Sequence, residues 1–202
     1  MRTLCALRAV VVATTTAVVI SLAGCAAGGA EIETSHLPVN SADVAFAQRM
    51  IVHHKQAIEM SAMATTRSRN AAVTGLAVSV DRAHSEGIAV LTELLKDWGQ
   101  PVQPELDGSA PAVDASPSAG GSGQIGEADL ARLRASSGAA FDRLLLVLMI
   151  EHHKEGISIV RLQQEVGQSP RARGVADGIE ADHTAELTAM QKLISSLSDP
   201  PR

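Results

Sequence analysis

The sequence predicts an all-α protein, a four-helix bundle built from two repeated helical hairpins. Apolar residues recur with the three-to-four-residue period of amphipathic helices, and no segment alternates as a strand does. Gly-rich and Pro-rich segments separate the helical stretches. The two halves also align without gaps at a single offset of 99 residues. These three observations favour a duplicated hairpin over any mixed or β architecture.

The first hairpin is expected to span 41–98. Its first helix, at 41–66, begins with a Ser or Asn N-cap and carries the acid Asp43 in its first turn. Its second helix covers 70–98 and stops at Gly99, which is followed closely by a Pro.

The second hairpin, at 127–198, follows a flexible linker at 99–126 that holds four Pro and a Gly-Gly-Ser-Gly run. A minor helix at 127–136 precedes the third long helix at 140–166. A Ser-Pro pair then starts the fourth helix, which runs from 170 to about 197. Residues 41–198 are therefore expected to form one bundle.

Residues 1–24 are typical of an export signal. Arg2 and Arg8 precede an uncharged run of about 14 small and apolar residues, shorter than the roughly 20 that a transmembrane helix needs. The run closes with Leu-Ala-Gly-Cys, which resembles the bacterial lipobox. We expect a lipidated Cys25, followed by a tether at 25–40. The protein would then be anchored outside the cytoplasm, on the cytoplasmic membrane or on an outer membrane if the source has one.

Removal of this signal leaves 15 basic and 22 acidic residues, an acidic balance that argues against nucleic-acid binding. Cys5 leaves with the signal and Cys25 is expected to be acylated, so neither an intrachain disulfide nor a thiolate metal site is expected. One Trp, two Phe and no Tyr leave little aromatic surface for stacking sugars or bases.

Six of the seven histidines belong to the repeat, and all six are expected on the apolar faces of their helices. Burying imidazoles without partners costs about 1–3 kcal/mol for each unpaired polar group, so either a metal or a hydrogen-bond network must satisfy them. A Met stands one turn before each His pair. The candidate metal ligands are Met50, His53, His54, His84, Met149, His152, His153 and His183.

Acids are available to accept hydrogen bonds from the second ring nitrogens. The four candidates are Asp43, Asp81, Asp142 and Glu180. Imidazole and thioether ligands suit copper, whereas an iron or manganese centre of the ferritin type needs about four inward Glu, more than the repeat offers. Copper is therefore the expected metal. A bundle whose histidines bond only to acids or backbone stays open as the alternative.

The motif Met-Ile-x-His-His occurs at 50–54 and at 149–153, each time after an Asp and a Phe in the preceding two turns. In these residues, and over about 41–198, the chain resembles the exported bacterial family called domain of unknown function three hundred and five. The resemblance implies a ferritin-like four-helix bundle. It also implies, for some members, copper binding and copper resistance outside the cytoplasm. By that resemblance the Met and the two His of each motif become the candidate copper ligands.

The chain departs from the family pattern in the second helix of each hairpin, where Gln-x-x-Glu-Ile is usual. His84 and His183 stand in place of the Gln, and Gly87 replaces the first Glu. We expect a lipid-anchored protein that binds copper or a similar metal for sequestration, delivery or tolerance rather than turnover. The alternatives are a ferritin-like metal-dependent oxidase and a metal-free helical interaction module. The protein partner, the oligomeric state and the number of metal sites stay open.

Overall fold

The computed structural model describes residues 38–103 and 124–197. The expected export signal, most of the tether with Cys25, and the centre of the linker lie outside the described residues. All regular structure in the described ranges is helical, which confirms the all-α prediction. The helices are α1 (Ser41–Ala62), α2 (Ala64–Arg67), α3 (Ala71–Asp97), α4 (Glu127–Ala135), α5 (Gly138–Val166) and α6 (Pro170–Ser196).

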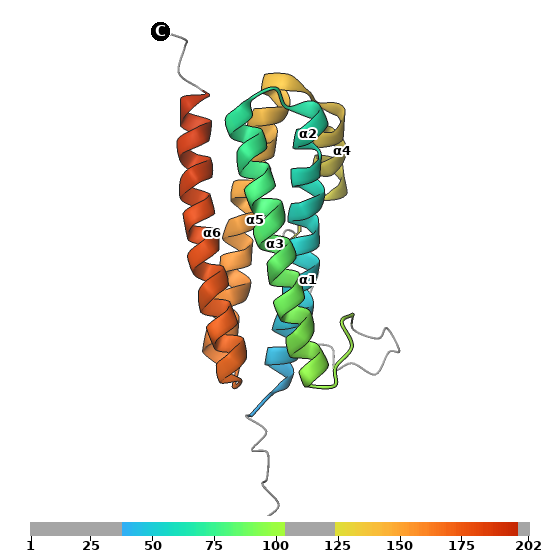
Figure 1. Cartoon of the computed structure of the whole chain (residues 1–202), viewed down its shortest axis with the longest axis vertical. Helices are drawn as coiled ribbons and strands as arrows, with labels where there is room; N and C mark the ends of the chain where they lie inside the picture. Colours follow the sequence, from blue (N-terminus) through green and yellow to red (C-terminus); the bar gives the residue numbers. More distant parts are fainter. Residues whose placement is uncertain (1–37, 104–123, 198–202) are drawn as a thin grey trace, which may run out of the picture. The chain divides into compact units, whose positions relative to one another are not determined.

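The four long helices form two hairpins that pack against each other (Figure 1). In the first hairpin α1 pairs with α3, and in the second α5 pairs with α6. Between the hairpins α1 lies against α5 and α3 lies against α6, while the short α2 and α4 both contact α5. None of the helices in the described ranges is long and apolar enough to cross a membrane.

The helix starts follow the side-chain signals in the sequence. Asn40 and Asp43 form a capping box at the start of α1, and the side chain of Asn70 accepts hydrogen bonds from the first amides of α3. Ser169 caps α6, which begins with a Pro. At the other end of α3, Gly99 adopts a φ of 64°, a left-handed conformation that stops the helix.

The predicted first helix is divided in the structure, because α1 ends at Ala62 and α2 forms a separate turn. The hydroxyl of Thr65 donates to the carbonyl of Ala62 at 2.9 Å, and the hydroxyl of Thr66 donates to that of Met63 at 3.4 Å. The break thus coincides with two bonds from side chain to backbone, of a kind that competes with the helical ladder. The helical segment does end near residue 66, as predicted, but it consists of two helices rather than one.

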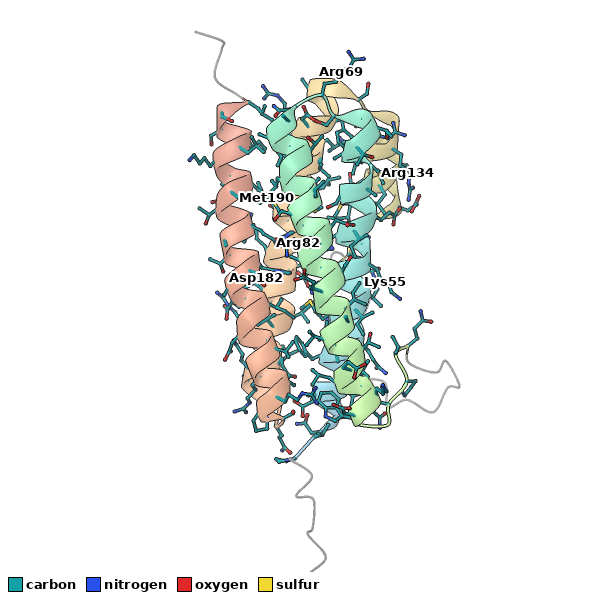
Figure 2. All side chains as sticks on the ribbon, in the orientation of Figure 1. Lys55, Arg69, Arg82, Arg134, Asp182 and Met190 are labelled. Atoms are coloured by element: carbon teal, nitrogen blue, oxygen red, sulfur yellow. The ribbon has the colours of Figure 1, made fainter. Side chains whose placement is uncertain are left out.

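The apolar core consists of two clusters. The Phe46 cluster is formed by the first halves of α1 and α6 and the second halves of α3 and α5. The Phe141 cluster is formed by the opposite halves and includes Met190, which Figure 2 shows on the inner side of α6. The repeat histidines stand near the midpoint of each long helix, between these two clusters. The bundle therefore holds its polar residues in a layer with packed apolar side chains on both sides.

The buried carboxylate of Asp43 joins the two hairpins at one end of the bundle. Besides its capping bond, it accepts hydrogen bonds from the amide side chain of Gln163 and from the backbone N–H groups of Gln168 and Ser169 in the turn between α5 and α6. Asp43 is fully buried, so water could not take its place as the acceptor for these donors. This residue aligns the first hairpin with the turn of the second.

Candidate metal centre

The six repeat histidines form one buried layer, the histidine layer, in which each exposes 2% or less of its surface. The rings of His53 and His152 stack with their centroids 3.7 Å apart. The centroids of His54 and His84 are 4.4 Å apart, and those of His153 and His183 are 4.7 Å apart. The structure therefore brings together side chains from all four long helices, whereas the sequence left open whether the histidines form one centre or two.

Helical periodicity sets this arrangement, because the residues adjacent to the histidines point outward. Lys55, directly after the His pair of α1, and Asp182, directly before His183, are both exposed, and Figure 2 shows Lys55 on the outer side of α1. Each helix is therefore amphipathic: its histidines lie on the buried face, and the charged residues next to them in sequence lie on the solvent face.

Three rings are held by backbone carbonyls. His53 donates from Nε2 to the carbonyl of His152 at 3.0 Å, and His153 donates from Nδ1 to that of Met149 at 2.9 Å. The ring of His84 has a backbone hydrogen bond to Val80. A carbonyl only accepts, so the nitrogen that faces it carries the proton and the other ring nitrogen carries a lone pair. This is the state in which histidine binds metals.

Many ring nitrogens of the histidine layer have no hydrogen-bond partner although they are fully buried. They are His53 Nδ1, His54 Nδ1, His84 Nε2, both nitrogens of His152 and both nitrogens of His183. Each unpartnered buried group costs about 1–3 kcal/mol relative to a satisfied one. A metal ion that accepts these lone pairs would remove much of that cost.

Five of the six imidazoles of the layer have a lowered pKa, which favours their neutral form. Burial, together with charge repulsion from the ring of His153, lowers the pKa of His53 and of His84 from 6.5 to about 4. Burial, followed by repulsion from His84, lowers the pKa of His54 to about 2. The same causes put the pKa values of His152 and His183 lower still. Protons therefore compete poorly with a metal for these nitrogens near neutral pH.

Two groups of side chains are close enough to share an ion, since the ligand atoms within each lie within 4.8 Å of one another. One group consists of His53, His54 and His183. The other consists of His84, His153, His183 and Glu186. Imidazole nitrogens with a carboxylate oxygen suit copper, nickel or zinc better than magnesium or calcium. The residues present thus fit a transition metal.

Glu186 is a site residue that the sequence analysis did not select. Its Oε2 lies 2.8 Å from Nε2 of His153, and its side chain is 13% exposed. It stands one helical turn after His183, on the same face of α6. Asp81 and Glu180 were selected because they stand one turn before His84 and His183; the same criterion applied one turn after His183 identifies Glu186. Its counterpart in the repeat is Gly87, so a search for matched residues passes over it.

None of the four acids that were expected to accept ring N–H groups has a hydrogen bond to a His ring among the described residues. Glu180 accepts hydrogen bonds from Gln164 at 3.0 Å and from Arg161 at 3.1 Å, and these two donors lower its pKa. Asp43 bonds to the turn between α5 and α6. Asp142 is buried, but its Oδ1 has no partner. For Asp81, which is half-buried, the described residues include no hydrogen bond to a His ring. Backbone carbonyls hold the rings instead.

Met50 and Met149 are both buried, one turn before their His pairs, but they belong to different clusters. Met50 packs in the Phe46 cluster and Met149 in the Phe141 cluster. The two thioethers therefore flank the histidine layer from opposite sides.

Fold and site together define a helical-bundle protein with a buried, histidine-rich candidate metal centre. The sequence pattern of the family described as Domain of unknown function (DUF305) matches residues 43–194, and the chain belongs to this family. Comparison with the curated proteins found no match.

Solved structures share the fold. A DUF305 fragment from Deinococcus radiodurans has a TM-score of 0.67 at 24% identity and covers 79% of this chain and 99% of its own. A DUF305 protein from Streptomyces coelicolor has a TM-score of 0.67 at 23% identity, with coverage of 80% and 97%. CopM in the Cu(I)-bound form has a TM-score of 0.61 at 22% identity, with coverage of 78% and 98%. CopM is also known in Cu(II)-bound and Ag-bound forms.

Proposed function

We propose that this protein is an exported, lipid-anchored copper-binding protein that sequesters or delivers the metal, and that the histidine layer is its binding site. The observation that carries the proposal is the set of buried ring nitrogens without partners at the centre of the bundle. The proposed ligands are the six histidines of the layer, with the sulfurs of Met50 and Met149 as further ligands for Cu(I).

Copper is favoured over other metals by two lines of support. Imidazole and thioether are ligands that copper accepts in both oxidation states. CopM, which shares the fold, is known with Cu(I), Cu(II) and silver bound. Bound copper would supply positive charge to the lone pairs of the layer, while the chain's own contribution is to hold the rings neutral, oriented and away from water.

The proposed location outside the cytoplasm rests on the signal-like residues 1–24 and on Cys25 in its lipobox-like context. Lipidation supplies about 0.8 kcal/mol per buried CH₂, and more than one chain is needed for stable anchoring. The Streptomyces coelicolor relative is itself described as a predicted secreted protein.

The proposal is tested by anaerobic titration of the full chain, purified without a histidine tag, with Cu(I) against a chromophoric chelator. The wild type should compete for the metal, and a variant with Ala at both His pairs (His53, His54, His152 and His153) should lose at least about 100-fold in affinity. His36→Ala is the matched control, because His36 is the one histidine outside the repeat. Circular dichroism verifies that each variant is folded.

Metal analysis of the same wild-type preparation separates the alternatives. Copper supports the proposal. Iron that is oxidised rapidly by O₂ would favour a ferritin-like oxidase, and a protein that binds no metal would favour an interaction module. X-ray absorption at the copper edge must show imidazole ligands, and this measurement on the wild type decides the question even if the fourfold variant fails to fold.

A further inference from the structure

The two hairpins contribute differently to the histidine layer. His54 and His153 occupy matched positions, and so do Gly87 and Glu186. In the second hairpin Glu186 reaches Nε2 of His153 at 2.8 Å. In the first, a Cβ placed on Gly87 would lie 2.7 Å from Nε2 of His54, so the ring fills the space that a side chain would need. One half of the layer therefore contains a carboxylate, and the other half contains only imidazoles.

The contact between Glu186 and His153 has the geometry of two ligands of one ion. His153 donates its Nδ1 proton to the carbonyl of Met149, which leaves Nε2 as the ring nitrogen that faces the carboxylate. The two atoms lie 2.8 Å apart, so a metal ion could take the place of the hydrogen bond between them. Ligands at about 2.0 Å from an ion, and at a right angle to each other, are themselves about 2.8 Å apart.

His183 belongs to both groups of ligand atoms. Both of its ring nitrogens are buried and unpartnered, so neither hydrogen bonding nor solvent ties it to one group. Gly156 makes room for it, since a Cβ there would lie 2.7 Å from Nε2 of His183 and 2.7 Å from Cε1 of His53. The ring is therefore packed where the two groups meet.

We propose that the histidine layer contains two overlapping, non-equivalent copper positions that share His183. The position made by His84, His153, His183 and Glu186 takes Cu(II). The position made by His53, His54 and His183 takes Cu(I). This inference rests on the proposed function and adds to it the division of the layer by oxidation state.

The ligand chemistry supports this division. Three nitrogens and one carboxylate oxygen form a set typical of Cu(II), and the negative carboxylate attracts a dication more strongly than a monocation. The all-imidazole group has no charge to neutralise the second positive charge of Cu(II), and its neutral ligands suit the single charge of Cu(I). Because both positions use His183, the first ion should weaken the binding of a second.

The test compares two conservative variants on the same helix of the full chain. Glu186→Gln removes the charge but keeps an oxygen beside His153. Glu180→Gln is the matched control, because Glu180 bonds to Gln164 and Arg161 rather than to the layer. Cu(II) affinity is measured by competition, with electron paramagnetic resonance of the bound ion, and Cu(I) affinity is measured anaerobically with a chromophoric chelator.

We expect Glu186→Gln to lower Cu(II) affinity at least about 10-fold and to change the resonance spectrum, while Cu(I) affinity stays within about threefold of the wild type. Glu180→Gln should change neither. His54→Gln should do the reverse of Glu186→Gln and weaken Cu(I) more than Cu(II).

The inference is overturned if Glu186→Gln weakens both ions equally or neither. That result leaves the proposed function intact as long as the wild type binds copper. If the wild type binds neither ion, the proposed function itself is wrong. The two failures are therefore distinguishable in one set of measurements.

Discussion

Acidification should destabilise the metal-free protein well above the pH at which carboxylates titrate. The pKa values of His53 and His84 are lowered from 6.5 to about 4, and that of His54 to about 2, mainly because burial disfavours the charged ring. The unfolded chain then binds more protons than the folded chain whenever the pH lies between these values and 6.5. The stability of the neutral layer is complete above pH 6.5 and declines as the pH falls below it.

The magnitude follows from linkage. At about pH 5.5 an unfolded His is about nine-tenths protonated, while these three folded rings remain neutral. Each ring then lowers the free energy of unfolding by about 1.4 kcal/mol relative to pH 7.5, and the three together lower it by about 4 kcal/mol. The lowered pKa values of His152 and His183 act in the same direction. A loss of this size is a large fraction of the roughly 5–15 kcal/mol that stabilises a typical domain.

Urea unfolding of the metal-free protein at pH 7.5 and 5.5 measures the effect. Circular dichroism reports the helices, and fluorescence of the single Trp reports the end of α3. His36→Ala should show the same loss as the wild type, because His36 lies outside the repeat. An unfolding free energy that is equal at the two pH values would refute the reasoning, since it would mean that the layer titrates normally in the folded state.

Five further substitutions, two of which are controls, have definite expected outcomes. Asp43→Ala should lower the unfolding free energy by about 3 kcal/mol, because the turn amides lose their acceptor, whereas Asp142→Ala should cost less than about 1 kcal/mol; equal losses in urea unfolding would contradict this. Gly156→Ala should weaken copper binding by displacing two rings, while Gly75→Ala, which has open space around it, should raise the melting temperature slightly and leave copper affinity unchanged. Cys25→Ser should release the protein from membranes on fractionation, and a processed, membrane-bound variant would exclude the lipid anchor.

The long helices were predictable because local signals and the repeat agree. The caps at Asn70 and Ser169 are encoded within a few residues, and the matched histidines lie on the apolar face that each helix buries. The break after Ala62 was not predictable from the sequence, because residues 41–67 contain neither a Pro nor a Gly that would mark it.

The candidate site was predictable in its histidines but not in what surrounds them. Backbone carbonyls that hold rings leave no mark in a sequence, so acids such as Glu180 were assigned that role. Glu186 was not selected because its counterpart is Gly87, and the site residues were chosen as residues that recur in both halves of the repeat. The role of Asp43 depends on a turn more than a hundred residues away, which no local pattern reveals.

The bond network of Asp43 has a consequence for the history of the duplication. In a dimer of identical hairpins, each Asp at this position would face the turn of the other copy. In this chain the counterpart of Asp43 is Asp142, whose Oδ1 has no partner, and the amide of Asn70 in the corresponding turn bonds to Ser68 instead. Two copies of the first hairpin could therefore not reproduce the junction, because the turn amide that would face Asp43 already has a partner. The two hairpins are thus complementary rather than interchangeable at this end of the bundle.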